Sequence, residues 1–129
     1  WDVLADNESW PEWFGACKAA RSTSEPPHGV GSTRWVQVDQ FKVDERFVVW
    51  DAPERWGFTI VDANSPLAET VVELITLQPD GDGTALAYDF TAALRTWAKP
   101  LTPILRWQFT RMFANSLAGV QPYLDARAR

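Results

Sequence analysis

The chain of 129 residues has the length and composition of one globular domain, with 46% hydrophobic and 22% charged residues. Its formal net charge is -5, from 12 basic and 17 acidic residues, which argues against binding to nucleic acid because phosphate contacts dominate that affinity. No apolar run approaches the roughly 18 residues that span a bilayer, so no integral membrane segment is expected.

The chain has one Cys and one His, and these counts argue against metal and thiol chemistry. A single Cys allows no internal disulfide and is typical of a reducing compartment, so the cytoplasm is the expected location. No second Cys or His stands at ligand spacing, and we expect neither a metal nor a cofactor. Cys17 with His28 is a formal nucleophile and base, but we interpret Cys17 as a half-buried thiol near the start of a strand.

The first 15 residues predict two short helical pieces that present aromatic side chains. Trp1 and Leu4 share one face at helical spacing. Ser9 and Glu12 form a capping-box pattern that starts the second piece, and Gly15 ends it. Three Trp and one Phe fall within the first 14 positions, and they fit either a core or one wall of a pocket.

The middle of the chain predicts an antiparallel meander, because segments with alternating apolar and polar positions are separated by turn signals. The turn "PDGDG" is expected to join the last two strands through three to five residues. The expected strands are Lys18–Ser24, Thr33–Gln40, Phe41–Trp50, a segment from Trp56 through Ile60 to Val61, Glu69–Gln78 and Thr84–Ala92.

The register of the last hairpin stays open. One pairing puts Val72 and Leu74 beside Tyr88, and the next puts Glu73 and Ile75 there. A slip of one residue moves every side chain to the other face, so the pairing decides whether Glu73 faces inward.

The last part of the chain predicts one long amphipathic helix from Thr102. Thr102 fits the N-cap and Pro103 the first helical position. Gly119 and Pro122 predict a bend or break near residues 118–122, because Pro removes a helical hydrogen bond. Apolar residues recur at steps of three and four at Leu105, Phe109, Met112, Phe113, Leu117, Val120 and Leu124.

These elements predict an α+β fold in a single domain, residues 1–129, with two short helices, a curved antiparallel sheet and a long C-terminal helix. One amphipathic helix covers the apolar face of such a sheet only in part. A pocket is therefore expected between the sheet and the helix.

Four motifs, taken in chain order, carry a resemblance to a known family. The matching positions are Trp1, Leu4, Asp6, Pro11, Trp13 and Phe14 in the opening; Gly29, Gly31 and Arg34; Trp50, Asp51, Pro53 and Arg55; and Asp80, Gly81, Gly83 and Thr84. In this order they resemble the polyketide cyclase/dehydrase and lipid-transport family of the START-like (Bet v 1-like, SRPBCC) superfamily.

The resemblance implies a helix-grip fold, in which the curved sheet wraps around the long C-terminal helix and leaves a ligand cavity. It also implies a strand before the first helix, so we expect that this N-terminal strand is absent from the chain and that one sheet edge is unpaired. Similar proteins include aromatase/cyclases, lipid carriers and hormone receptors, so the resemblance implies no single activity.

The expected ligand contacts are large inward-facing side chains. Each of these side chains also fits an ordinary position in the hydrophobic core, but the eight Trp in this chain favour a rigid aromatic lining of the pocket. The candidates are Trp13, Phe14, Trp35, Trp50, Phe58, Ile60, Tyr88, Phe90, Phe109 and Phe113.

Few polar groups are candidates for the same space. Arg34 and Arg46 are expected on a solvated outer face, and an inward Arg would need a carboxylate from Glu73 or from a ligand. Tyr88 is the preferred polar anchor, because a buried phenol finds a hydrogen-bond partner. The polar candidates are Arg34, Arg46, Glu73, Tyr88 and Gln108, and all but Gln108 are the candidates for a catalytic role.

We favour a protein that binds, and carries, a hydrophobic small molecule, lipid-like or aromatic, between the sheet and the C-terminal helix. The first alternative is an enzyme similar to polyketide aromatase/cyclases, in which a general acid or base closes and dehydrates the chain. The second is a protein-interaction module with a vestigial cavity, supported if Trp10 and Trp107 form an exposed patch. A homodimer is compatible with each of them.

Overall fold

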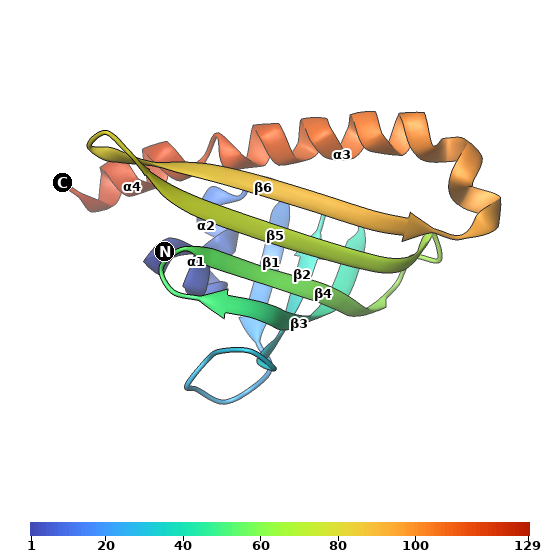
Figure 1. Ribbon diagram of the computed structural model, residues 1–129, viewed down its shortest axis with the longest axis horizontal. Coiled ribbons are helices and arrows are strands. Elements are labelled where there is room, and N and C mark those ends of the chain that lie inside the picture. The colour runs from blue at the N-terminus through green and yellow to red at the C-terminus, as the bar shows by residue number, and fades with distance from the viewer.

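The computed structural model describes residues 1–129 and shows a curved antiparallel sheet with a long helix lying across its concave face (Figure 1). The predicted α+β helix-grip architecture is confirmed. The helical elements are α1 (Asp2–Ala5), the 3-10 turn η1 (Asn7–Ser9), α2 (Trp10–Trp13), the 3-10 helix η2 (Thr96–Leu101), α3 (Thr102–Leu117) and α4 (Val120–Arg127). The strands are β1 (Cys17–Ser22), β2 (Thr33–Val38), β3 (Phe41–Asp51), β4 (Arg55–Ala63), β5 (Ala68–Asp80) and β6 (Gly83–Leu94).

The six strands form one sheet in the order β1-β2-β3-β4-β5-β6, and every neighbouring pair is antiparallel. The meander is therefore as predicted, with β1 and β6 at the edges. The last turn is tighter than expected, because Asp80 pairs with Gly83 and only Gly81 and Asp82 lie between them. Gly81 has a φ of 57°, which glycine adopts without steric cost and which a two-residue hairpin needs.

The two short helices close one end of the sheet with aromatic side chains. Trp10 stacks on Trp56 of β4, with the ring centroids 5.3 Å apart. The indole Nε1 of Trp10 donates a hydrogen bond to the carbonyl oxygen of Leu4 at 3.0 Å, which ties α2 to α1. Trp10, Trp13 and Phe14 are each 2% exposed. The crowded aromatics at the start of the chain are thus mainly core.

The C-terminal helix is anchored where α3 passes into α4, near the predicted break. The backbone N–H of Ala16 donates to Ser116 Oγ at 3.1 Å. A Cβ on Gly119 would lie only 2.0 Å from the carbonyl oxygen of Trp13, so the two backbones meet closely at this point. Pro122 falls in the first turn of α4, where a missing N–H leaves no helical bond unmade.

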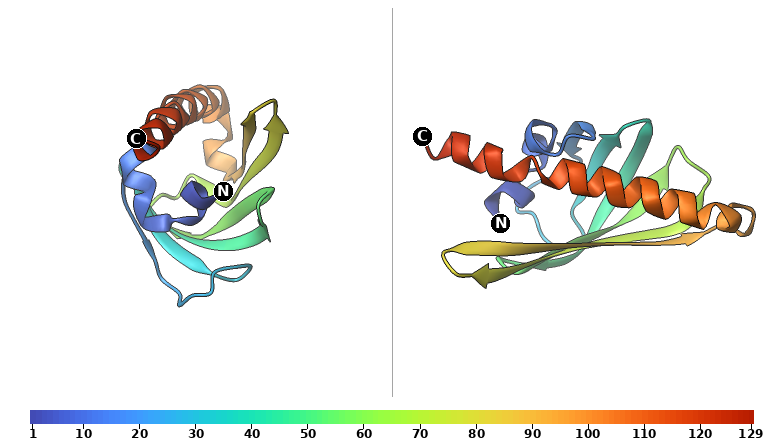
Figure 2. Two further views of the ribbon diagram at one scale, coloured as in Figure 1. Left: turned by 90° about the vertical axis from the view of Figure 1, so that its left-hand side faces the viewer. Right: turned by 90° about the horizontal axis from the view of Figure 1, so that it is seen from above.

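Beyond this anchor, α3 runs across the concave face of the sheet (Figure 2). Ser116 is the only residue of α3 that is buried. The side chains that face the sheet remain half-buried, although they are large and apolar; they are Leu105, Phe109, Met112, Phe113 and Leu117. The predicted amphipathic stripe therefore exists, but the sheet does not cover it.

We predict that Gly119→Ala lowers the free energy of unfolding by about 1–3 kcal/mol, because the new methyl group must push the α3–α4 junction off the Trp13 carbonyl. Thermal unfolding measures this as a fall of roughly 4 °C in Tm for each kcal/mol. Gly29→Ala is the matched control, because nothing lies within 4 Å of the position of its Cβ. Equal Tm values for the two variants would contradict the anchor.

Candidate functional site

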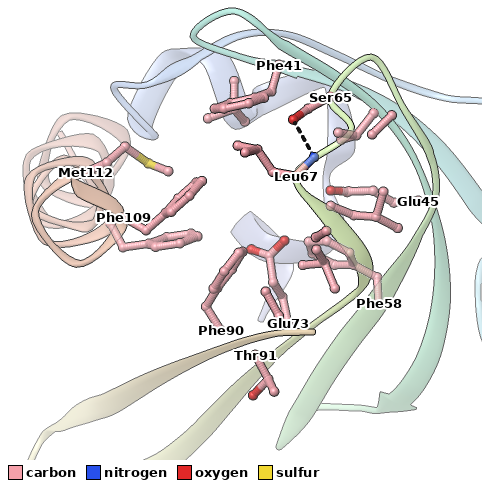
Figure 3. A pocket seen from close by; sticks show the side chains of 18 of the residues that line it. Phe41, Glu45, Phe58, Ser65, Leu67, Glu73, Phe90, Thr91, Phe109 and Met112 are labelled. Atoms are coloured by element: carbon pink, nitrogen blue, oxygen red, sulfur yellow. Dashed lines mark hydrogen bonds between the residues drawn. The ribbon is translucent and has the colours of Figure 1, made fainter. Parts of the chain in front are cut away.

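A cavity of about 920 Å³ lies between the concave face of the sheet and α3 (Figure 3). Of its 36 lining residues 23 are hydrophobic, so the space suits an apolar molecule. Its volume lies toward the upper end of the range of about 300–1,000 Å³ that small-molecule pockets occupy.

Seven of the ten predicted contact residues line this cavity. The rings of Phe90 and Phe109 stack with their centroids 5.1 Å apart, so β6 and α3 meet through them on one side of the cavity. Phe113 lies 4.7 Å from the ring of Tyr88 and extends this aromatic wall. The seven are Phe14, Phe58, Ile60, Tyr88, Phe90, Phe109 and Phe113. That they contact a ligand stays a prediction.

The other three predicted contacts, Trp13, Trp35 and Trp50, do not line the cavity. Trp13 is buried in the core that α2 forms. Trp35 points to the opposite face of the sheet, because its strand neighbours on both sides face inward, and Arg21 lies 4.4 Å above its ring. Trp50 packs edge-on against Trp1 at 5.6 Å. Placing these three in the lining was wrong.

An ion pair lies buried at one end of the cavity. Arg34 Nε donates to Glu45 Oε1 at 2.6 Å, and the two side chains are 2% and 4% exposed. The register of β2 and β3 places these two residues opposite each other. The inward position of Arg34 corrects the expected outward one. Four rings enclose its guanidinium carbon, at 4.4 Å for Trp10, 4.9 Å for Trp56, 5.0 Å for Phe58 and 5.6 Å for Phe47.

Arg46 and Gln108 do not contribute to the cavity. Both side chains are exposed, and for Arg46 this agrees with the outward position that the sequence predicted. Arg46 is therefore removed from the catalytic candidates. Glu45, which was not among the predicted site residues, lies in the site instead. The alternation of Phe41, Val43 and Phe47 on β3 places Glu45 on the inward face and could have indicated it.

The register of the last hairpin brings Glu73 into the cavity. Ile75 pairs with Tyr88, and Glu73 pairs with Phe90. The Tyr88 hydroxyl donates a hydrogen bond to Glu73 Oε1 at 2.5 Å. Glu73 is 6% exposed, and its carboxyl group points into the cavity (Figure 3). Of the two pairings that the sequence left open, the inward one is correct.

Burial and, to a smaller extent, the negative charge of Glu45 together raise the pKa of Glu73 to about 8, although the hydrogen bond from Tyr88 and the charge of Arg34 oppose them. Burial also raises the pKa of Glu45 from its ordinary value, although Arg34 favours its ionised form. Arg34 cannot lose its proton in a protein, so a carboxylate must balance it, and Glu45 is the one in contact. At neutral pH, Glu73 is then the group that keeps its proton.

Burial raises the pKa of Tyr88 well above its ordinary value, so the phenol stays neutral. Cys17 is buried rather than half-buried, and burial raises the pKa of its thiol to about 11, so it does not supply a nucleophile at neutral pH. No group of three His, Cys, Asp or Glu side chains is arranged to hold a metal ion. The site can thus enclose an apolar molecule and offer it one buried carboxyl group.

We predict that Glu73 makes the protein less stable as the pH rises from about 5 to about 8. A folded-state pKa near 8 means that the folded chain keeps a proton which the unfolded chain loses above about 4.5, so stability falls through this window. The slope is about 1.4 kcal/mol per pH unit at most. Urea unfolding of the wild type and of Glu73→Gln across this pH range measures the slope. The difference between the two free energies of unfolding isolates the contribution of Glu73. A difference that does not change with pH would contradict a protonated Glu73.

None of the helices combines the length and the apolar character that crossing a bilayer requires.

Comparison with known structures identifies the fold. A START superfamily protein from Mycobacterium smegmatis superimposes with a TM-score of 0.76 at 17% identity, over 95% of this chain and 87% of that one. Ara h 8.0201 gives 0.66 at 15% identity, over 93% and 84%. The major latex-like protein 151 of Panax ginseng gives 0.62 at 16% identity, over 85% and 81%.

Comparison with known sequences gives the family. An uncharacterised protein of Mycobacterium tuberculosis and one of Mycobacterium bovis are each 28% identical over 127 residues, which is 98% of this chain and 76% of theirs. Residues 1–125 match the family model described as polyketide cyclase / dehydrase and lipid transport, which confirms the resemblance seen in the motifs. The chain therefore belongs to the polyketide cyclase/dehydrase and lipid-transport family, with the helix-grip fold of START superfamily proteins.

Proposed function

We propose that the protein binds, and carries, a hydrophobic small molecule, lipid-like or aromatic, in the cavity between the sheet and α3. The observation that carries this proposal is the empty volume of about 920 Å³, lined mainly by apolar side chains that the fold leaves half-buried. A ligand that covers these side chains removes apolar surface from water, which is favourable in proportion to the area covered.

A second candidate is a cyclase or dehydratase that acts on a polyketide-like substrate. Glu73 favours it, because a general acid works best with a pKa near the operating pH. Binding alone is the better supported function, since Tyr88 and Arg34, the groups that could polarise a substrate, already contact other side chains. The Tyr88 hydroxyl donates to Glu73, and Arg34 is bound to Glu45, so neither is free to polarise a substrate carbonyl.

The protein-interaction alternative loses its main support. Trp10 is 2% exposed and stacked on Trp56, so it forms no exposed patch with Trp107, which is 61% exposed. The cavity is also not collapsed. The cytoplasm stays our proposed location on the single Cys, and a homodimer stays an open prediction.

We predict that Met112→Trp weakens the binding of the uncharged dye Nile red at least tenfold. Met112 points into the cavity from α3 (Figure 3), and a larger ring there occupies part of the space that a ligand needs. Dye fluorescence titration measures the Kd.

Asn115→Trp is the matched control, because Asn115 lies on the same helix but is exposed and outside the cavity lining. It adds the same ring and should change the Kd less than about twofold. Equal weakening by both variants, or no binding of Nile red to the wild type, would contradict the proposed function.

A further inference from the structure

We propose that the ligand presents an uncharged oxygen, a hydroxyl or a carbonyl, to the carboxyl group of Glu73, and that the cavity discriminates against molecules ending in a carboxylate. The inference rests on the proposed function, that the cavity takes up an apolar molecule. It adds the chemical class of the polar end of that molecule.

The hydrogen bonds of Glu73 leave one of its oxygens without a partner in the protein. Oε1 accepts from the Tyr88 hydroxyl, and Oε2 makes no hydrogen bond. The carboxyl group points into the space that Phe109 and Met112 border from α3 (Figure 3). Neither of these side chains offers an oxygen or nitrogen. Oε2 is not completely enclosed by the protein, so it borders the cavity, and a ligand atom in hydrogen-bond reach of Oε2 would replace a contact with water.

An anionic headgroup finds no free positive charge at this end of the cavity. Arg34 is its only buried cation, and Nε of that residue is already bound to Glu45. Nη1 of Arg34 is buried without a hydrogen-bond partner, inside the cluster of aromatic rings around the guanidinium. The guanidinium is therefore engaged by Glu45 and by rings of the core.

The environment of Glu73 disfavours any second negative charge beside it. Burial and the charge of Glu45 raise the pKa of Glu73 to about 8, and both effects act equally on a ligand carboxylate at the same place. An uncharged hydroxyl or carbonyl oxygen has no such cost. It accepts the hydrogen bond of the protonated carboxyl group, and a hydroxyl also donates to the ionised one.

The groups that face Glu73 come from three other strands of the sheet. They are Arg34 on β2, Glu45 on β3 and Tyr88 on β6, while α3 contributes mainly apolar side chains to the cavity, with Thr102, Arg106 and Thr110 as its polar ones. Tyr88 does not ionise near neutral pH, because burial raises its pKa well above the ordinary value. The other charged residues of the lining are exposed; they are Asp62, Glu69, Asp89, Arg95 and Arg106.

The test is displacement of Nile red from the full chain by 1-decanol, decanoate and decylamine at about pH 6.5 and about pH 9.5. Decanoate is ionised and decanol is neutral at both values, so their difference in hydration cancels in the comparison. In the wild type, the ratio of the decanoate Kd to the decanol Kd should rise about tenfold between the two pH values, as Glu73 ionises. In Glu73→Gln, the same ratio should change less than about twofold.

Tyr88→Phe provides a second, independent variant. The hydrogen bond from Tyr88 lowers the pKa of Glu73, so its loss should move the rise of the ratio to higher pH. This variant keeps the inference testable if Glu73→Gln does not fold.

A wild-type ratio that stays constant with pH would overturn the inference, as would decylamine binding tenfold more tightly than decanol at about pH 6.5. Failure of the proposed function looks different, because then neither Nile red nor any competitor binds the wild type at either pH.

Discussion

The constraint on which this structure depends is that one helix must cover a curved six-stranded sheet while being anchored at one end. The anchor combines a close contact between the backbones of Gly119 and Trp13 with a hydrogen bond from the Ala16 N–H to Ser116 Oγ. Beyond it, α3 crosses the concave face with large side chains that remain half-buried. Interiors of proteins are normally packed as densely as organic crystals, so an unfilled space of this size is itself the feature to be explained.

The aromatic core determines which charged groups in that space already have a partner in the protein. Arg34 is held by Glu45 through Nε and enclosed by aromatic rings, so its charge is balanced within the protein although Nη1 has no hydrogen-bond partner. Glu73 then remains as a carboxyl group with no cation in contact, and burial keeps its proton on at neutral pH. Such a group costs stability, and groups of this kind gather at functional sites. The position of Glu73, buried in a cavity lined mainly by apolar side chains, fits a role in recognising what enters.

Much of the fold could be predicted from the sequence because its periodicities are regular. Alternation on β4 and β6 predicted the inward rows with Phe58 and Tyr88, and helical spacing predicted Phe109 and Phe113 on one face of α3. The motif set predicted the family and the helix-grip architecture. These features are local, so they can be predicted without knowing the register in which the strands pair.

The predictions that were wrong or left open concern residues whose position depends on how strands and helices pack together. A charged residue on an alternating strand is normally placed outward, but Arg34 shares the inward face of β2 with Val36, and Glu45 directly opposite it on β3 balances its charge there. The position of Glu73 depended on a register that one residue of slip reverses. Trp13 and Trp35 are as large and apolar as the true lining residues, and only the packing of α2 and the face of β2 exclude them. The sequence predicts that such side chains are buried, but it does not predict which part of the molecule they pack against.

The central claim is that α3 and the sheet enclose an unfilled apolar space with Glu73 as its polar contact. A crystal structure of the protein with a bromine-tagged decanol tests it most directly, because anomalous scattering locates the bromine without bias. The account predicts bromine between α3 and the sheet, with the ligand hydroxyl within hydrogen-bond distance of the Glu73 carboxyl group. Side chains of α3 packed onto the sheet, with bromine absent from the space between them, would contradict it.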